Sequence, residues 1–284
     1  MSALPSRLLI MPLMLLIKMS AAAALAPKAS SSIWPQPMEF TAHGGPSTVM
    51  VAGAPYFFQL RGDRRSPILS AAFARYAALA FPHVADASKS TCPSGAAEVY
   101  RLEFHVSDLS EDHPAITTDE SYTLTINSTA QAVHAKTVYG ALHALETFAQ
   151  LVSFNFDCGR YELPYSAIVV ADAPRFPHRG LMIDTARHYQ PLASLRAMID
   201  SLPFAKLNVL HWHLVDTQSF PFASSTYPKL SQAAYAPSQR YTHGDVRTRI
   251  STARAIACSP KEHPSDPPPS DPPPSDPPPS GPPP

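Results

Sequence analysis

The sequence has no excess of charge of either sign. Lysine and arginine together number 22, aspartate and glutamate together also number 22, and the formal net charge at pH 7 is zero. No basic stripe interleaved with aromatic residues occurs along the chain, although this pattern is typical of nucleic-acid-binding proteins. We therefore predict no nucleic-acid partner.

The sequence also has few cysteines and no apolar run of the ~20 residues that a membrane-spanning helix needs. The most apolar stretch, residues 8–17, follows Arg7 and precedes the small residues of 21–26. This order is typical of a cleavable secretory signal, which we predict over residues 1–26, with an uncleaved anchor as the alternative. The chain is then expected in the secretory pathway, outside the cell or in a vacuole or lysosome, without a stable membrane anchor.

Two further features fit an exported protein. Of the three cysteines, Cys92 and Cys158 lie in the first globular segment, and we predict a disulfide between them. Asn127 begins an Asn-Ser-Thr sequon after a strand-like run, which predicts glycosylation in a surface turn.

Proline is abundant, but 12 of the 33 prolines lie in the repeats of residues 265–284. Proline fixes φ and lacks a backbone donor, so such repeats form no packed core. We predict a disordered tail over residues 251–284 that acts as a spacer. The alternative is a ligand for an aromatic groove.

Residues 27–175 show the mixed patterns of a small α+β domain. One helix is predicted from the cap Ser66, and a second from the cap Thr137. Alternating apolar residues predict half-buried strands over residues 100–106 and 122–126. The residues expected to face inward are Leu69, Phe73, Tyr76 and Leu79 or Ala80 in the first helix, Val138, Leu142, Leu145, Phe148 and Val152 in the second, and Tyr100, Leu102, Phe104, Val106, Tyr122, Leu124 and Ile126 in the strands.

Residues 176–250 change to the order strand, helix, strand. Residues 181–183 and 207–215 are continuous apolar runs, and a helix with inward-facing leucines and isoleucine is predicted from Pro191. This order predicts a parallel βαβ unit and the incomplete start of a (β/α)8 barrel.

Both predicted barrel strands end in polar residues. Asp184, with Arg187 just beyond it, follows the first strand, and Asp216 follows the second. In α/β barrels the carboxyl ends of the strands hold the active site. These side chains are therefore candidate functional residues, with a helix cap or loop ligand as the alternative for each carboxylate.

Three segments resemble glycoside hydrolase family 20, the β-N-acetylhexosaminidases, and most closely its plant-like members. They are HRGLMIDTARHY at residues 178–189, KLNVLHWHLVD at residues 206–216, and TVYGALHALETF at residues 137–148. The resemblance covers residues 30–246, which it divides into an accessory domain and the beginning of the catalytic barrel.

The resemblance implies retaining hydrolysis of terminal N-acetylglucosamine or N-acetylgalactosamine from glycans, with the acetamido oxygen of the substrate as nucleophile. Arg187 matches the arginine that binds the hydroxyls of the terminal sugar, and Asp216 matches a carboxylate that steadies a histidine near the general acid. The family uses no cofactor, and its members often form dimers.

The resemblance stops before the Asp-Glu pair that performs the chemistry in the family. The Asp-Glu dipeptide of this chain, Asp119-Glu120, lies in a polar loop of the accessory domain, where a solvated turn is predicted. Residues 247–260 are expected to lack the next barrel strand, which leaves about two of eight strands. We therefore predict a hexosaminidase chain that is inactive alone, with a non-catalytic sugar-binding or interaction protein as the alternative.

His211 and His213 lie on the same side of a predicted strand, where two imidazoles are able to bind a metal. No third ligand is evident in the sequence, so we predict hydrogen-bonded strand histidines and no metal site. Trp212 on the opposite side is predicted to belong to the core rather than to stack on a sugar.

Overall fold

The computed structural model describes residues 33–50, 57–62, 65–86, 89, 97–255 and 259–261. The predicted signal peptide, Cys92, and the tail beyond residue 261 lie outside the described residues. The strands are β1 Glu39–His43, β2 Ser47–Val49, β3 Phe58–Leu60, β4 Glu98–Val99, β5 Leu102–Val106, β6 Tyr122–Ile126, β7 Gln131–Ala135, β8 Ser153–Asn155, β9 Arg160–Leu163, β10 Ala167–Asp172, β11 Gly180–Asp184, β12 Val209–His213 and β13 Ser259–Lys261. The α-helices are α1 Pro67–Ala80, α2 Val138–Leu151, α3 Leu192–Ser201 and α4 His243–Ala255, and the 3-10 helices are η3 Leu202–Ala205 and η4 Pro228–Ala233.

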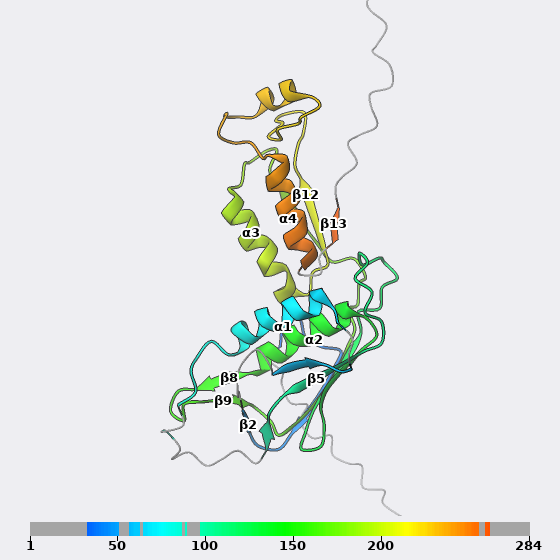
Figure 1. Ribbon diagram of the computed structural model, residues 1–284, viewed down its shortest axis with the longest axis vertical. Helices are drawn as coiled ribbons and strands as arrows, with labels where there is room; N and C mark the ends of the chain where they lie inside the picture. The colour runs from blue at the N-terminus through cyan, green and yellow to red at the C-terminus, as the bar shows by residue number, and fades with distance from the viewer. Residues whose placement is uncertain are drawn as a thin grey trace, which may run out of the picture.

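The first part of the chain is an α+β unit. Six strands form one sheet in the order β1-β10-β6-β7-β5-β3, and a smaller sheet has the order β4-β2-β9-β8. Helices α1 and α2 lie side by side against the strands (Figure 1). Their apolar faces and the facing strand residues form one large buried core, which includes Leu69, Phe104, Leu124 and Phe148.

Both helices of this unit begin at their predicted caps. The Ser66 hydroxyl accepts a hydrogen bond from the Leu69 amide at 3.1 Å, and Pro67 occupies the first turn. The Thr137 hydroxyl accepts from the Gly140 amide at 3.4 Å. Since each cap satisfies an amide that the helix leaves free, local sequence determines where both helices start.

The structure corrects one predicted inward-facing residue, Tyr100, and decides between the two alternatives Leu79 and Ala80. Tyr100 precedes β5, and 58% of it is exposed. Ala80 is buried, whereas Leu79 is 46% exposed, so Ala80 completes the inner face of α1. Helix α2 is buried on nearly all sides rather than along one stripe, because α1, the large sheet and η3 all pack around it.

The second part of the chain is a three-stranded parallel sheet in the order β11-β12-β13, and α3 and α4 lie beside it (Figure 1). Both helices contribute residues to the buried core of this part. Helix α3 begins after Pro191, as predicted, and buries Leu195 and Ile199. This sheet therefore has three parallel strands, with α3 between the first two and α4 between the last two, which is the pattern of a partial barrel.

Two predictions about the end of the chain were wrong. The absence of a third barrel strand was expected, yet residues Ser259–Lys261 pair in parallel with β12. The disordered tail was expected from residue 251, but α4 continues to Ala255. Both errors have one cause, because the polar helix α4 and the short strand β13 have weak patterns of their own and depend on the neighbouring β12 and α3.

Gly140 in the first turn of α2 allows a close approach of two backbones. A Cβ at this position would lie 2.3 Å from the carbonyl oxygen of Ser121, the residue immediately before β6. Alanine favours an exposed helix interior over glycine by about 1 kcal/mol. A clash with backbone outweighs this gain, since overpacking typically costs about 1–3 kcal/mol and a carbonyl has little freedom to move.

We therefore expect Gly140→Ala to lower the free energy of unfolding by about 2–3 kcal/mol in urea titrations. Gly45→Ala is the matched control, because no atom lies within 4 Å of its added Cβ. Equal unfolding midpoints for the two variants would contradict the close packing of α2 on Ser121.

Candidate active site at the carboxyl ends of two parallel strands

The polar residues that end β11 and β12 come together at one edge of the sheet. Asp184 and His213 are direct partners in the register of these parallel strands. The Thr185 amide donates to the His213 carbonyl oxygen at 3.0 Å, which ties the loop after β11 to the end of β12. Parallel pairing thus places side chains that are almost thirty residues apart in sequence within one cluster.

Arg187 lies at the centre of this cluster. Its Nη1 donates to Asp184 Oδ2 at 2.9 Å, and its Nη2 lies 2.7 Å from Asp216 Oδ2. The Arg187 side chain remains 53% exposed, so its guanidinium is fixed by two carboxylates and still open to solvent. These two contacts raise the pKa of Arg187, with the hydrogen bond to Asp184 as the larger cause. The group therefore stays cationic at every accessible pH.

Asp184 shapes the turn that carries Arg187. Its Oδ1 accepts from the amides of Ala186 at 3.1 Å and Arg187 at 3.0 Å, while Oδ2 accepts from the guanidinium. Partial burial opposes ionisation of Asp184, but the hydrogen bonds and charge of Arg187 outweigh it and lower the pKa of the carboxyl. Asp184 thus accepts hydrogen bonds from the loop amides, which is the alternative role predicted for it, and it is also a direct partner of Arg187.

Asp216 is held from two sides. Its Oδ2 lies 2.9 Å from His213 Nε2, and its Oδ1 accepts from the amide and hydroxyl of Thr217. The hydrogen bond to His213 is the largest influence on Asp216, and together with Thr217 and Arg187 it lowers the pKa to about 2. This carboxylate therefore contributes its negative charge throughout the range above pH 4.

The contacts of β12 agree with the predictions for Trp212 and for a hydrogen-bonded His213. Within the described ranges no group of three or more histidine, cysteine or carboxylate side chains has the arrangement of a metal site. Trp212 belongs to the core between the strands and helices, and its Nε1 donates to Thr185 Oγ1 at 2.8 Å. Its ring meets the fully buried Tyr241 edge-to-face, so Trp212 packs against the core as predicted.

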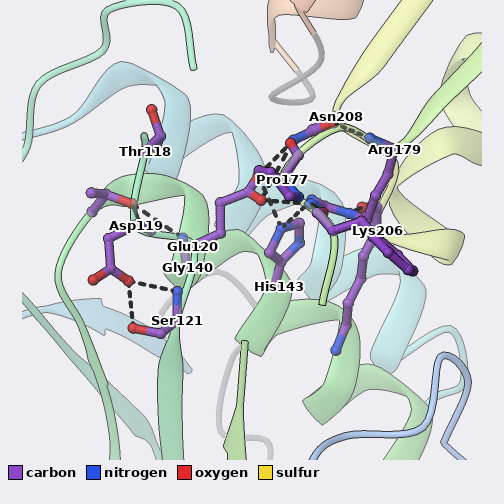
Figure 2. Close-up of polar contacts among 12 residues, drawn as sticks. Thr118, Asp119, Glu120, Ser121, Gly140, His143, Pro177, Arg179, Lys206 and Asn208 are labelled. Atoms are coloured by element: carbon purple, nitrogen blue, oxygen red, sulfur yellow. Dashed lines mark hydrogen bonds and ion pairs between the residues drawn. The ribbon is translucent and has the colours of Figure 1, made fainter. Parts of the chain in front are cut away.

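The prediction of a solvated turn at Asp119-Glu120 was half wrong. Asp119 does close a turn, since it accepts from the amide of Ser121 at 2.9 Å, and its pKa is lowered to about 2 chiefly by hydrogen bonds from Ser121. Glu120 is instead only 7% exposed and points into the boundary between the two parts of the chain (Figure 2). Sequence reasoning missed it because its partners lie far along the chain.

Glu120 is the centre of a buried ionic network (Figure 2). Its Oε2 lies 2.7 Å from Arg179 Nη1, its Oε1 lies 3.5 Å from His143 Nε2, and Asn208 Nδ2 donates to Oε1 at 3.2 Å. Burial opposes ionisation of Glu120, but these donors outweigh it and lower the pKa to about 2. Burial lowers the pKa of His143, so that ring is neutral at neutral pH.

A second buried ion pair lies close by. Lys206 Nζ is 2.7 Å from Asp172 Oδ2, and it also donates to Tyr122 and Thr147 at 3.0 Å each. Burial lowers the pKa of Lys206, although Asp172 opposes that shift. Every donor of the ammonium group therefore has an acceptor, as burial of a charge requires.

These two networks join the α+β unit to one particular end of the parallel sheet. Arg179 immediately precedes β11, and Lys206 and Asn208 precede β12. The networks therefore clamp the amino ends of the strands, whereas Arg187 and Asp216 lie beyond the carboxyl ends. The polar residues at the start of two otherwise apolar strands were the available sequence signal for this interface.

The fold and the strand-end cluster define a class of protein with known relatives. Residues 33–151 match the family described as beta-acetyl hexosaminidase like, and residues 176–258 match the glycosyl hydrolase family 20 catalytic domain. The two matches cover most of the chain in the family's domain order, and the chain belongs to glycoside hydrolase family 20.

Individual relatives agree with this assignment. The chain is 39% identical over 230 residues to beta-hexosaminidase 3 of Arabidopsis thaliana, an alignment that covers 78% of this chain and 42% of the relative. It is 47% identical over 142 residues to human beta-hexosaminidase subunit beta, covering 50% of this chain and 25% of that protein. The chain therefore spans less than half the length of these relatives.

Solved structures agree as well. The chitobiase of Flavobacterium johnsoniae matches with a TM-score of 0.61 and 25% identity, over 80% of this chain and 33% of that one. The Streptomyces plicatus N-acetyl-beta-hexosaminidase matches with a TM-score of 0.59 at 19% identity, over 80% of this chain and 44% of that one, which supports the fold alone.

Three remaining predictions concern export. Cys158 is disulfide-bonded, while its predicted partner Cys92 lies outside the described residues. Asn127 lies in the turn between β6 and β7, where its Oδ1 accepts from the amide and hydroxyl of Thr129 at 2.8 Å each. Among the described helices, none is long and apolar enough to cross a membrane.

Proposed function

We propose that this chain provides the terminal-sugar-binding part of a β-N-acetylhexosaminidase that hydrolyses terminal N-acetylglucosamine or N-acetylgalactosamine residues from glycans. The observation that carries this proposal is the guanidinium of Arg187, which is fixed between Asp184 and Asp216 and half-exposed at the carboxyl ends of two barrel strands. Several relatives bear the name beta-hexosaminidase, which supports the same reaction.

The geometry gives Arg187 a specific task. A guanidinium presents five N–H donors in a rigid plane, and two of its edges are already oriented by carboxylates. The remaining donors are available to sugar hydroxyls without loss of side-chain freedom on binding. Charged donors form stronger hydrogen bonds to hydroxyls than neutral donors do, so the guanidinium suits the hydroxyls of a sugar.

Asp216 supports the reaction indirectly. Its negative charge lies against His213 and Arg187, so it stabilises the cationic form of any imidazole in contact with it. We propose that it holds the histidine that steadies the general acid, while the substrate's acetamido oxygen acts as nucleophile in a retaining mechanism. The Asp-Glu pair of that mechanism is not supplied by Asp119-Glu120, because Glu120 is buried at the opposite end of the strands.

We further propose that the chain enters the secretory pathway and carries a glycan on Asn127. The disulfide at Cys158 and the position of Asn127 in a hairpin turn support this proposal. Mass spectrometry of the secreted protein, before and after treatment with a peptide N-glycosidase, tests the assignment. Loss of the added mass in Asn127→Gln is expected, and an unmodified Asn127 in the exported protein would contradict it.

The sugar-binding role is tested by steady-state kinetics of a chimera. In this chimera residues 33–246 replace the matching segment of Arabidopsis beta-hexosaminidase 3, and the substrate is a nitrophenyl N-acetylglucosaminide. We expect Arg187→Ala to lower kcat/KM about 10- to 100-fold, because buried hydroxyls lose charged donors worth about 1.5–3 kcal/mol. Arg187→Lys should restore activity only partly, since a single ammonium lacks the planar fork.

Asp216→Asn in the same chimera keeps the shape of the side chain and removes its charge. The pKa of Asp216 is about 2, so the wild-type carboxylate is ionised at every assay pH. Its loss should lower the pKa of neighbouring acids and imidazoles and move the pH–rate profile to lower pH.

Arg196→Ala is the control for both variants, because Arg196 is exposed on α3 and pairs only with the exposed Asp200 among the described salt bridges. Unchanged kcat/KM in Arg187→Ala would remove the proposed sugar-binding role, and an unchanged profile in Asp216→Asn would leave Asp216 a structural cap.

A further inference from the structure

One ring nitrogen in the strand-end cluster lies between a donor and an acceptor that cannot exchange roles. Nε2 of His213 is 3.0 Å from Arg187 Nη1 and 2.9 Å from Asp216 Oδ2. The guanidinium has donors and no acceptor, and the ionised carboxylate has acceptors and no donor. Nε2 therefore forms only one of these two hydrogen bonds at a time.

The proton on Nε2 decides which hydrogen bond forms. When Nε2 is unprotonated, its lone pair accepts from Arg187 Nη1. When Nε2 carries a proton, it donates to Asp216, and Nη1 keeps Asp184 Oδ2 as its acceptor. The ring does not need to move, because both partners are already within hydrogen-bond distance.

We propose that His213 is a positioning residue that holds Arg187 when neutral and, on protonation, transfers its hydrogen bond to Asp216 and leaves one Arg187 N–H for the ligand. The inference rests on the proposed function only for the identity of that ligand, a sugar hydroxyl. The exchange itself follows from the two distances.

Charged and titratable groups face His213 from three segments of the chain. Asp184 from the end of β11, Arg187 from the following loop and Asp216 from the loop after β12 all face the cluster, and His211 on the same strand has its ring 6.5 Å away. With neutral histidines, one cation faces two carboxylates, so the cluster holds one surplus negative charge. Protonation of His213 removes this surplus, which offsets the repulsion between imidazolium and guanidinium.

The test is NMR of the 284-residue chain labelled with 15N in histidine and arginine. Long-range 15N–1H spectra report which ring nitrogen carries the proton, and loss of signals in His213→Gln identifies the ring. At high pH we expect an unprotonated Nε2 and a protonated Nδ1. As the pH falls, Nε2 should gain its proton, and the Arg187 side-chain signals, identified with Arg187→Lys, should shift with the same midpoint.

Two variants separate the exchange from a general effect of charge. Asp216→Asn removes the negative charge of the acceptor in the protonated state, and the His213 midpoint should fall. Asp200→Asn removes a carboxylate from the exposed surface of α3 and should leave the midpoint unchanged.

Each opposite outcome overturns the proposal. A neutral ring that carries its proton on Nε2 would mean that Asp216 is the partner at every pH. Arg187 signals that do not follow the His213 titration, or a midpoint unaffected by Asp216→Asn, would show that the ring does not position the guanidinium. The spectra of the unsubstituted chain are decisive even where a variant fails to fold. Since no substrate is present, failure here is distinct from failure of the proposed hydrolysis.

Discussion

The 284-residue chain, purified as it stands, is expected to release no chromophore from a nitrophenyl N-acetylglucosaminide. A general acid typically contributes about 10²- to 10⁴-fold to the rate, and the proposed mechanism also needs an adjacent aspartate to orient the acetamido group. The chain has one Asp-Glu dipeptide, and its glutamate forms an ion pair with Arg179 at the amino ends of the strands. That glutamate cannot reach a sugar bound at Arg187.

Arabidopsis beta-hexosaminidase 3, assayed in parallel, provides the positive control for the substrate. Isothermal titration with N-acetylglucosamine then distinguishes a sugar-binding chain from an inert one, since binding without turnover should be weakened by Arg187→Ala. Turnover at the rate of the control enzyme, retained through purification and lost in Arg187→Ala, would show that the chain is catalytically complete without the predicted pair.

Glu120→Ala is expected to destabilise the protein by about 3–5 kcal/mol, the usual cost of removing one partner from a buried ion pair. The substitution leaves the guanidinium of Arg179, whose side chain is only 14% exposed, without its carboxylate. It also removes one of the two acceptors of Asn208 Nδ2, which lies at 3.2 Å, and leaves the Pro177 carbonyl oxygen as the other. Urea unfolding followed by circular dichroism measures the loss. Because the network joins two parts of the chain, we also expect separate transitions for them in place of one.

The control for this prediction is Glu39→Ala. Glu39 is exposed at the start of β1, where a substitution should change stability by less than about 0.5 kcal/mol. Equal unfolding curves for the two variants would mean that the interface does not depend on Glu120. Replacement by glutamine keeps one acceptor for Asn208, so Glu120→Gln should lie between the other two.

The same network predicts a pH dependence of stability. The pKa of Glu120 is lowered from 4.5 to about 2 in the folded protein. A group with a lowered folded-state pKa stabilises the fold above its unfolded pKa, and this contribution disappears as the pH falls through the folded value. The wild type should therefore lose stability between about pH 5 and pH 2. Glu120→Ala should lose less over that interval, and an identical acid dependence would contradict this assignment.

The local elements of this protein could be predicted because their causes lie within a few residues. Ser66 and Thr137 cap helices through hydrogen bonds to amides three residues ahead. Alternating residues form β6 because a strand has two faces. The candidate site could also be predicted, because parallel strands bring their carboxyl ends to one edge and so unite Asp184, Arg187 and Asp216.

Tertiary structure alone decided the features whose partners are distant in sequence. Glu120 lies in a polar segment that predicts a solvated turn, yet its side chain is buried. Its charge is compensated by donors from Arg179 and from Asn208, which is 88 residues away in the sequence. Strand β13 exists through its pairing with β12. Asp216 is a local partner of His213, but the competing partner Arg187 reached this ring only when β11 and β12 aligned. Caps and alternation follow from local bonding, whereas burial of a charge is set by the donors that the fold brings to it.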